Sequence, residues 1–238
     1  MLVAAAVCPC PPLLVPEVAA GAAAELDGLR AACYDAVAVL AAARPDRLVV
    51  IGPAEQAGRG PHPQGAPGSF REVGADRAVR LGPADGPPAP ERVLPLSLAV
   101  AGWLLERTRW AAAPVEGLGV GEPLSADRCA QVGREIATGA ERVALLVMGD
   151  GSACRSVRAP GYLDERATGF DAGVARALAE VDTEALMAVD EALAHELKAA
   201  GRAPWQVLAG AAEGADLDGE LLYDDAPYGV GYHVATWS

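Results

Sequence analysis

Residues 142–152 read Arg-Val-Ala-Leu-Leu-Val-Met-Gly-Asp-Gly-Ser, and this stretch decides the fold class. An apolar run of this length, ended by a Gly-Asp-Gly turn, is typical of a strand that is buried on both faces. Strands of that kind occur in parallel sheets covered by helices, and helical patterns flank this one at 125–138 and 170–178. We therefore expect an α/β fold.

The same alternation continues in both directions along the chain. Short apolar runs predict further strands at 2–7, 47–51, 73–81, 115–118, 220–223 and 230–236. Apolar spacings of three and four residues predict helices at 17–43, 94–108, 183–200 and 204–210. Gly- and Pro-rich stretches predict loops at 56–68 and 82–90, the first being either a surface excursion or a lid over a site.

No stretch reads as an interdomain linker, and the chain has no internal repeat. We predict one domain over residues 1–238, with a central, mixed, mostly parallel sheet flanked by helices. Apolar residues make up 52% of the chain and aromatic residues 5%, so the core must consist mainly of Ala, Val and Leu.

The charge and the first residues limit the partners and the compartment. The formal net charge is −13, which repels phosphate backbones, so we expect no nucleic acid partner. The apolar start of the chain lacks a basic region, and no apolar run reaches the roughly 20 residues that span a bilayer, so we expect no membrane partner. Five cysteines, an odd number, are interpreted as reduced thiols in a cytoplasmic protein.

Polar and thiol side chains follow three of the predicted strands. In α/β sheets, ligands bind at the carboxyl ends of the strands. Cys10 follows the first strand, and Glu55 follows the strand at 47–51. Asp150, Ser152 and Cys154 follow the strand at 142–148. We expect these five residues to surround one pocket that holds a small-molecule ligand.

These strand ends also carry a resemblance to a known superfamily. Segments 8–14 (Cys-Pro-Cys-Pro-Pro-Leu-Leu), 52–56 (Gly-Pro-Ala-Glu-Gln) and 149–152, followed by Phe170-Asp171, resemble the metal-binding segments of class III extradiol ring-cleavage dioxygenases, the LigB/Memo-like superfamily. Segments 201–204 and 230–232 resemble its Memo-like branch. The whole chain is similar to an uncharacterised actinobacterial dioxygenase-like group. The resemblance implies an extradiol-dioxygenase-like fold for the single domain.

The histidines that this family needs are missing. The family's first histidine falls on Cys10, the second region offers Glu55 or Gln56, and the Ser-His histidine falls on Ala153. A non-haem iron oxygenase typically needs two histidines and a carboxylate. The chain's three histidines lie elsewhere: His62, His195 and His233. We therefore expect neither an iron site nor catechol ring cleavage.

Two interpretations of the cysteines remain open, so the sequence does not decide whether the protein binds a cofactor. In one, Cys10, Glu55 and Cys154 hold a divalent metal such as zinc, or Cys154 is a nucleophile with Asp150 and Ser152 beside it. Arg155 and the backbone of the turn would then lower the pKa of Cys154. In the other interpretation, the cysteines are small buried apolar residues.

The sequence thus predicts a dioxygenase-like protein that acts on or binds a small molecule without ring cleavage. The alternative is a non-catalytic binding or assembly protein that retains the fold. The sequence does not decide whether the protein is an enzyme. It also does not decide whether the protein forms a homo-oligomer.

Overall fold

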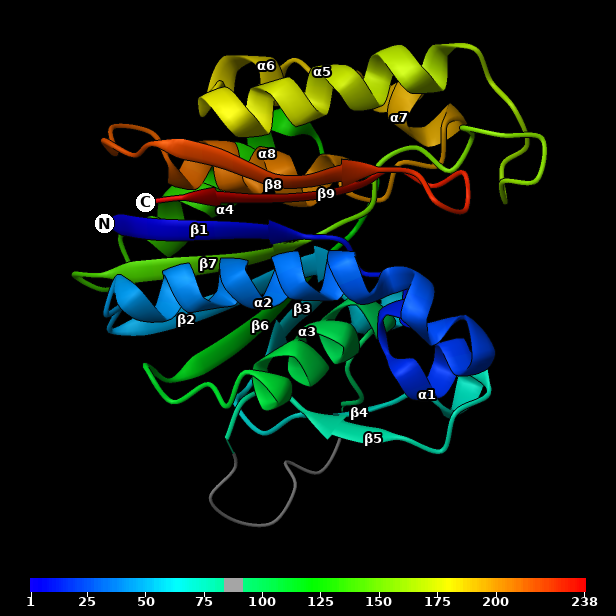
Figure 1. Ribbon diagram of the computed structural model, residues 1–238. Helices are drawn as coiled ribbons and strands as arrows, with labels where there is room; N and C mark the ends of the chain where they lie inside the picture. Colours follow the sequence, from blue (N-terminus) through cyan, green and yellow to red (C-terminus); the bar gives the residue numbers. More distant parts are fainter. Residues whose placement is uncertain (84–91) are drawn as a thin grey trace.

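A seven-stranded mixed sheet forms the centre of the computed structural model, which describes residues 1–83 and 92–238 (Figure 1). The strand order is β3-β6-β2-β7-β1-β9-β8, and the four strands β6, β2, β7 and β1 pair in parallel. β3 and β9 run antiparallel to their neighbours. The strands are β1 Leu2–Cys8, β2 Arg47–Pro53, β3 Gly60–His62, β6 Val115–Val120, β7 Val143–Met148, β8 Gly219–Asp225 and β9 Tyr232–Trp237.

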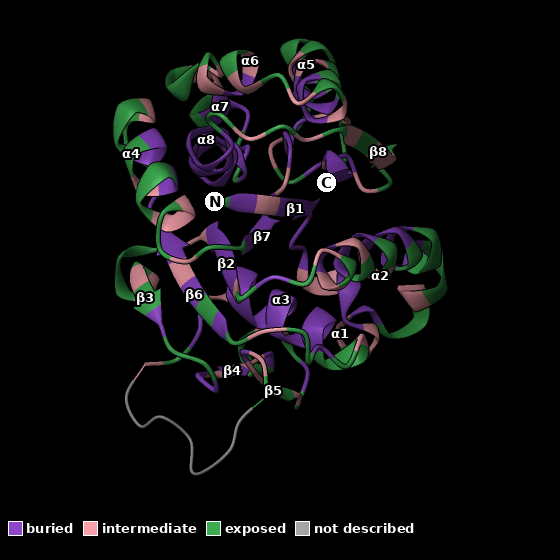
Figure 2. Ribbon diagram, turned by 90° about the vertical axis from the view of Figure 1, so that its left-hand side faces the viewer, coloured by how far each residue is buried: buried purple, intermediate pink, exposed green. Residues whose placement is uncertain are grey.

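Helices cover both faces of this sheet, and Figure 2 shows the two groups on opposite sides. One face carries α1 Pro16–Ala19, α2 Asp27–Ala42 and α3 Leu96–Arg107. The other carries α4 Ala126–Ala137, α5 Arg166–Glu180, α6 Thr183–Met187, α7 Glu191–Glu196 and α8 Arg202–Ala211. The predicted fold class, a single α/β domain with a mostly parallel sheet between helices, is confirmed.

Strand β7 has the burial that its sequence predicts. All six of its residues are buried, and their side chains alternate between the two cores. Leu146 and Met148 face α2 and α3, whereas Leu145 and Val147 face the opposite helices. Because a central strand contacts both layers, it needs apolar side chains at every position.

Some predicted elements differ in their bounds. The helix expected at 17–43 is divided into α1, a 3-10 segment over Ala20–Leu26 and α2. The chain turns at Ala20, whose φ is +48°. The helix expected at 183–200 divides into α6 and α7. Asp190 begins the second, where its carboxylate accepts a hydrogen bond from the Leu193 N–H at 2.7 Å.

The region between β2 and α3 holds more structure than its Gly and Pro content predicts. The loop expected at 56–68 contains β3, and it also contains β4 Pro67–Ser69, which pairs with β5 Ala78–Arg80 in a separate sheet. The strand expected at 73–81 is therefore only three residues long. The loop expected at 82–90 lies mostly outside the described residues. Among the described helices, none has the length and apolar content that crossing a bilayer requires.

Candidate functional site

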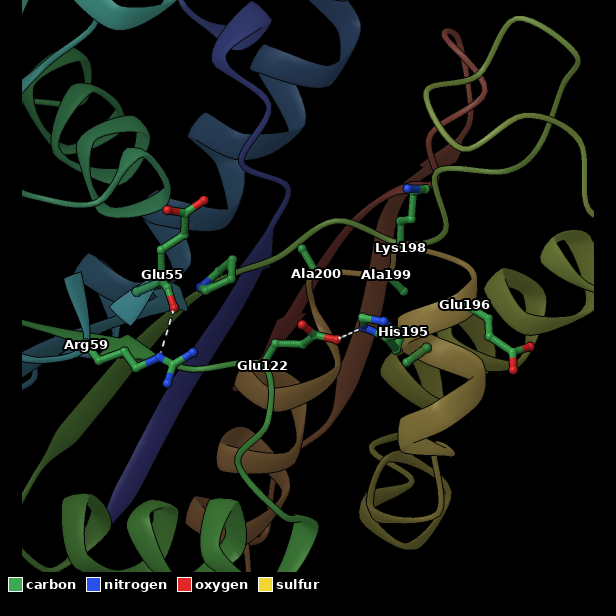
Figure 3. A pocket seen from close by; sticks show the side chains of 11 residues that line it. Glu55, Arg59, Glu122, His195, Glu196, Lys198, Ala199 and Ala200 are labelled. Carbon is green, nitrogen blue, oxygen red and sulfur yellow. Dashed lines mark hydrogen bonds and ion pairs between the residues drawn. The ribbon is translucent and has the colours of Figure 1, made fainter. Parts of the chain in front are cut away.

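A cavity of about 700 Å³ lies beyond the carboxyl ends of β2 and β6 (Figure 3). Its volume is within the range of small-molecule sites. One side is formed by the segment after β2 and by Glu122 after β6, and the other by α7 and the turn that follows it. The lining residues are Pro53, Ala54, Glu55, Arg59, Glu122, Ala194, His195, Glu196, Lys198, Ala199 and Ala200.

The turn after β2 is held against the end of β6, and this contact forms the first wall. The Ala54 N–H donates to the Val120 carbonyl at 2.8 Å and extends the pairing of the two strands. Gly119 on β6 is in close contact with the Gly58 carbonyl, where any side chain would collide. The glycine therefore lets the turn carry Glu55 and Arg59 to the cavity.

Two carboxylates of the cavity already have side-chain partners. Glu122 contacts Nδ1 of His195 across the cavity, as the dashed line in Figure 3 shows. Glu196 pairs with Arg166 at 2.7 Å. All four side chains are about half exposed or more, so each pair contributes little to stability.

A second group of polar residues lies at the carboxyl ends of β1 and β7, behind the cavity wall. We call Asp150, Ser152, Asp171, Asp224 and His233 the polar cluster. Its backbone is joined to the cavity wall, because the Gly201 N–H next to Ala200 donates to the Asp150 carbonyl at 2.9 Å. This hydrogen bond links the two sites.

Asp171 on α5 ties the turn after β7 to the helix layer. Its buried carboxylate accepts hydrogen bonds from the Ser152 N–H and Oγ, each at 2.7 Å, and from Arg155 Nη1 at 3.0 Å. Three donors, one of them charged, compensate the burial of this carboxylate.

His233 on β9 is fully buried and is oriented by Asp224 on β8. Its Nδ1 lies 3.0 Å from Asp224 Oδ1, and this hydrogen bond lowers the pKa of Asp224. Within the part of the chain that the structure describes, the buried Nε2 has no hydrogen-bond partner. It faces Gly151, where an added Cβ would lie 2.9 Å away. The contact with Asp224 thus fixes the orientation of the imidazole ring.

Asp150 has an unusual protonation state for an aspartate. Burial raises its pKa to about 6, although the Cys10 N–H, which donates to Oδ1 at 2.7 Å, and His233 oppose this shift. Burial and the nearby Asp150 also raise the pKa of the Cys10 thiol. Asp150 can thus take up or release a proton near neutral pH.

The structure brings together only some of the predicted site residues. Cys10, Asp150 and Ser152 meet at the ends of β1 and β7, whereas Glu55 lines the cavity and none of the other four does. β7 lies between β1 and β2 in the sheet, so the strands that precede Cys10 and Glu55 are both neighbours of β7. The cavity contains one of the five residues, and a pocket that all five share stays a prediction.

The predicted metal set is not assembled either. Among the described residues, no group of three or more His, Cys, Asp or Glu side chains is placed to hold a metal ion. Cys10, Glu55 and Cys154 lie in three separate surroundings, and Cys154 packs against Ala167 and Leu197. This geometry contradicts the prediction that Cys10, Glu55 and Cys154 together bind one zinc ion.

The prediction of a lowered Cys154 pKa is wrong. Burial raises the pKa of this thiol, Asp164 adds to the rise, and Lys198 opposes it. Arg155 does not assist, because it pairs with Asp171. The thiol donates instead to the Leu197 carbonyl at 3.5 Å. Its surroundings are those of a small core residue.

Sequence reasoning did not select eight charged or polar residues of these two sites: Arg59, Glu122, Asp171, His195, Glu196, Lys198, Asp224 and His233. For one pair a signal existed. The final two strands form an antiparallel hairpin in which Asp224 is the register partner of His233. Pairing the two strands from the sequence would have placed the carboxylate opposite the imidazole.

Comparisons with known proteins identify the fold alone. No protein-family model and no curated protein matches the chain. The chain resembles the crystal structure of an uncharacterised protein from Escherichia coli, with 15% sequence identity and a TM-score of 0.56, over 99% of each chain.

Proposed function

We propose that this protein binds a small molecule in the cavity beyond β2 and β6. The observation that carries the proposal is the position of the cavity. It has a ligand-sized volume and lies where parallel α/β sheets place their ligands, at the carboxyl ends of strands. Alanine and proline walls would contact an apolar body, and the charged side chains between them would orient it.

The scaffold that we propose is related to the extradiol dioxygenases but does not cleave catechols. Three segments support the relationship: residues 8–14, 52–56 and 149–152, which follow β1, β2 and β7. These three strands are neighbours in the sheet. The three segments that resemble a metal site thus lie at the carboxyl ends of adjacent strands, although other residues stand where the dioxygenases have histidines.

A cavity-filling substitution tests the binding function. Ala200 lines the cavity and is exposed, so Ala200→Trp should fill the cavity without disturbing the core. The probe is Nile red, a neutral dye that fluoresces in apolar sites. We expect the wild type and the matched control Ala200→Ser to bind the dye, and Ala200→Trp to lose most of the fluorescence. Equal dye binding by all three proteins would refute the proposal.

A further inference from the structure

We propose that the ligand of the cavity is an organic carboxylate and that Arg59 and Lys198 select it. This inference rests on the proposed binding function and adds the class of ligand. It starts from the charged side chains of the cavity that have no side-chain partner. Glu196 pairs with Arg166, and Glu122 is hydrogen-bonded to His195. Within the described residues, Arg59, Lys198 and Glu55 form no ion pair. Two cations and one carboxylate are therefore left without a side-chain partner.

Lys198 is the only lysine of the chain, since the other 18 of the 19 cationic residues are arginines. It lies on the cavity wall just after α7. Its aliphatic part passes next to Gly161, where an added Cβ would lie 3.0 Å from Cδ. The glycine thus leaves space for the lysine, whose ammonium group stays exposed.

Arg59 comes from the opposite wall, as Figure 3 shows. Its Nε has one long hydrogen bond, 3.4 Å to the Ala54 carbonyl. A side chain at Gly121, just after β6, would collide with the guanidinium. The missing side chain leaves the guanidinium, with its fork of N–H donors, free to bind a carboxylate.

The net charge of −13 opposes an anionic ligand at long range. At physiological ionic strength, however, charges are screened over about 8 Å, so the side chains that touch the ligand outweigh the distant ones. Hydrogen bonds from a cation to a carboxylate are roughly twice as strong as neutral ones. The two cations can therefore determine that the preferred ligand carries a negative charge.

Displacement of Nile red from the full-length protein tests the ligand class. The competitors share one ring and differ in charge: benzoate, phenyl phosphate, benzyl alcohol and benzylamine. We expect benzoate to displace the dye at the lowest concentration. Arg59→Gln and Lys198→Gln should each weaken the binding of benzoate about tenfold, because each substitution removes one charged contact. The control Arg176→Gln removes the same charge from the exposed face of α5 and should not change it.

Each other outcome is decisive. Benzylamine as the best competitor, or benzoate binding that neither cavity variant weakens, would overturn the inference. Phenyl phosphate as the best competitor would replace the carboxylate by a phosphate ligand. Far-UV circular dichroism and urea unfolding confirm that the variants are folded. If the dye does not bind the wild type at all, the proposed binding function fails, and this result is distinct from a failure of the ligand class.

Discussion

Single residues of the polar cluster control how the protein responds to pH. Asp150 is half buried, and it contacts the first strand through the Cys10 N–H. A carboxyl group in these surroundings holds its proton more firmly in the folded state than in the unfolded state.

Asp150 should make the protein less stable as the pH rises. Its pKa is raised from 3.8 to about 6 on folding, so the proton stabilises the folded state fully below about pH 4 and this contribution is lost as pH passes 6. Asp150→Asn cannot titrate. The unfolding free energy of the wild type, relative to the variant, should fall by roughly 2 kcal/mol between pH 4 and pH 7. Urea unfolding of both proteins measures this difference, and a constant difference would contradict the assignment.

The cysteines should be unreactive in the folded protein. All five are buried, and the pKa of Cys129, for example, is raised by burial to about 11. The thiolate is the reactive form, so iodoacetamide near neutral pH should label none of the five quickly. After unfolding in guanidinium chloride, all five should react. Mass spectrometry of native protein counts the labels, and one quickly labelled cysteine would show that its pKa is not raised.

At the scale of elements, close packing of helices decides where glycine is required. α4 and α8 lie against each other on one face of the sheet, and Gly133 of α4 touches the Val207 carbonyl of α8. On α5, by contrast, Gly173 has open space beside it. The two helical glycines therefore differ in what an added methyl group would contact.

Alanine should have opposite effects at these two positions. Gly133→Ala should destabilise the protein by about 1–3 kcal/mol, because the methyl group forces the helices apart. Gly173→Ala should stabilise it by about 0.5–1 kcal/mol, because alanine loses less backbone entropy in a helix. Urea unfolding at one pH compares both with the wild type. A loss of stability in Gly173→Ala would contradict the open space described for α5.

At the scale of the whole molecule, the strand order decides which residues can share a site. The order β2-β7-β1 places the ends of these strands side by side, yet Glu55 extends into the cavity and Cys10 stays at the polar cluster. The one histidine at this end of β1 and β7 is His233, which is oriented by Asp224.

Catechol ring cleavage should therefore be absent. A non-haem iron oxygenase typically needs two histidines and a carboxylate, whereas the segments after β1 and β2 carry Cys10 and Glu55. After anaerobic loading with iron(II), the protein should not consume oxygen steadily with protocatechuate. An oxygen electrode measures this, with iron in buffer as the blank. Steady consumption above the blank would contradict the prediction.

The sequence alone determined what depends on neighbouring residues. The apolar run of β7, the strand starts at Leu2 and Arg47 and the helix α3 follow from local periodicity, and these patterns were sufficient for the fold class. They also placed Asp150 and Ser152 directly after a buried strand. The break between α6 and α7 escaped prediction, because a capping aspartate such as Asp190 competes with the helical pattern around it.

Only the tertiary structure decided which residues meet. Hairpin pairing set Asp224 opposite His233, and helix packing brought Asp171 to Ser152. β7 enters between β1 and β2, although it follows them by about a hundred residues, and so it brings Asp150 next to Cys10. Such contacts depend on burying two faces of one sheet at once. That is a property of the whole chain, and no local pattern contains it.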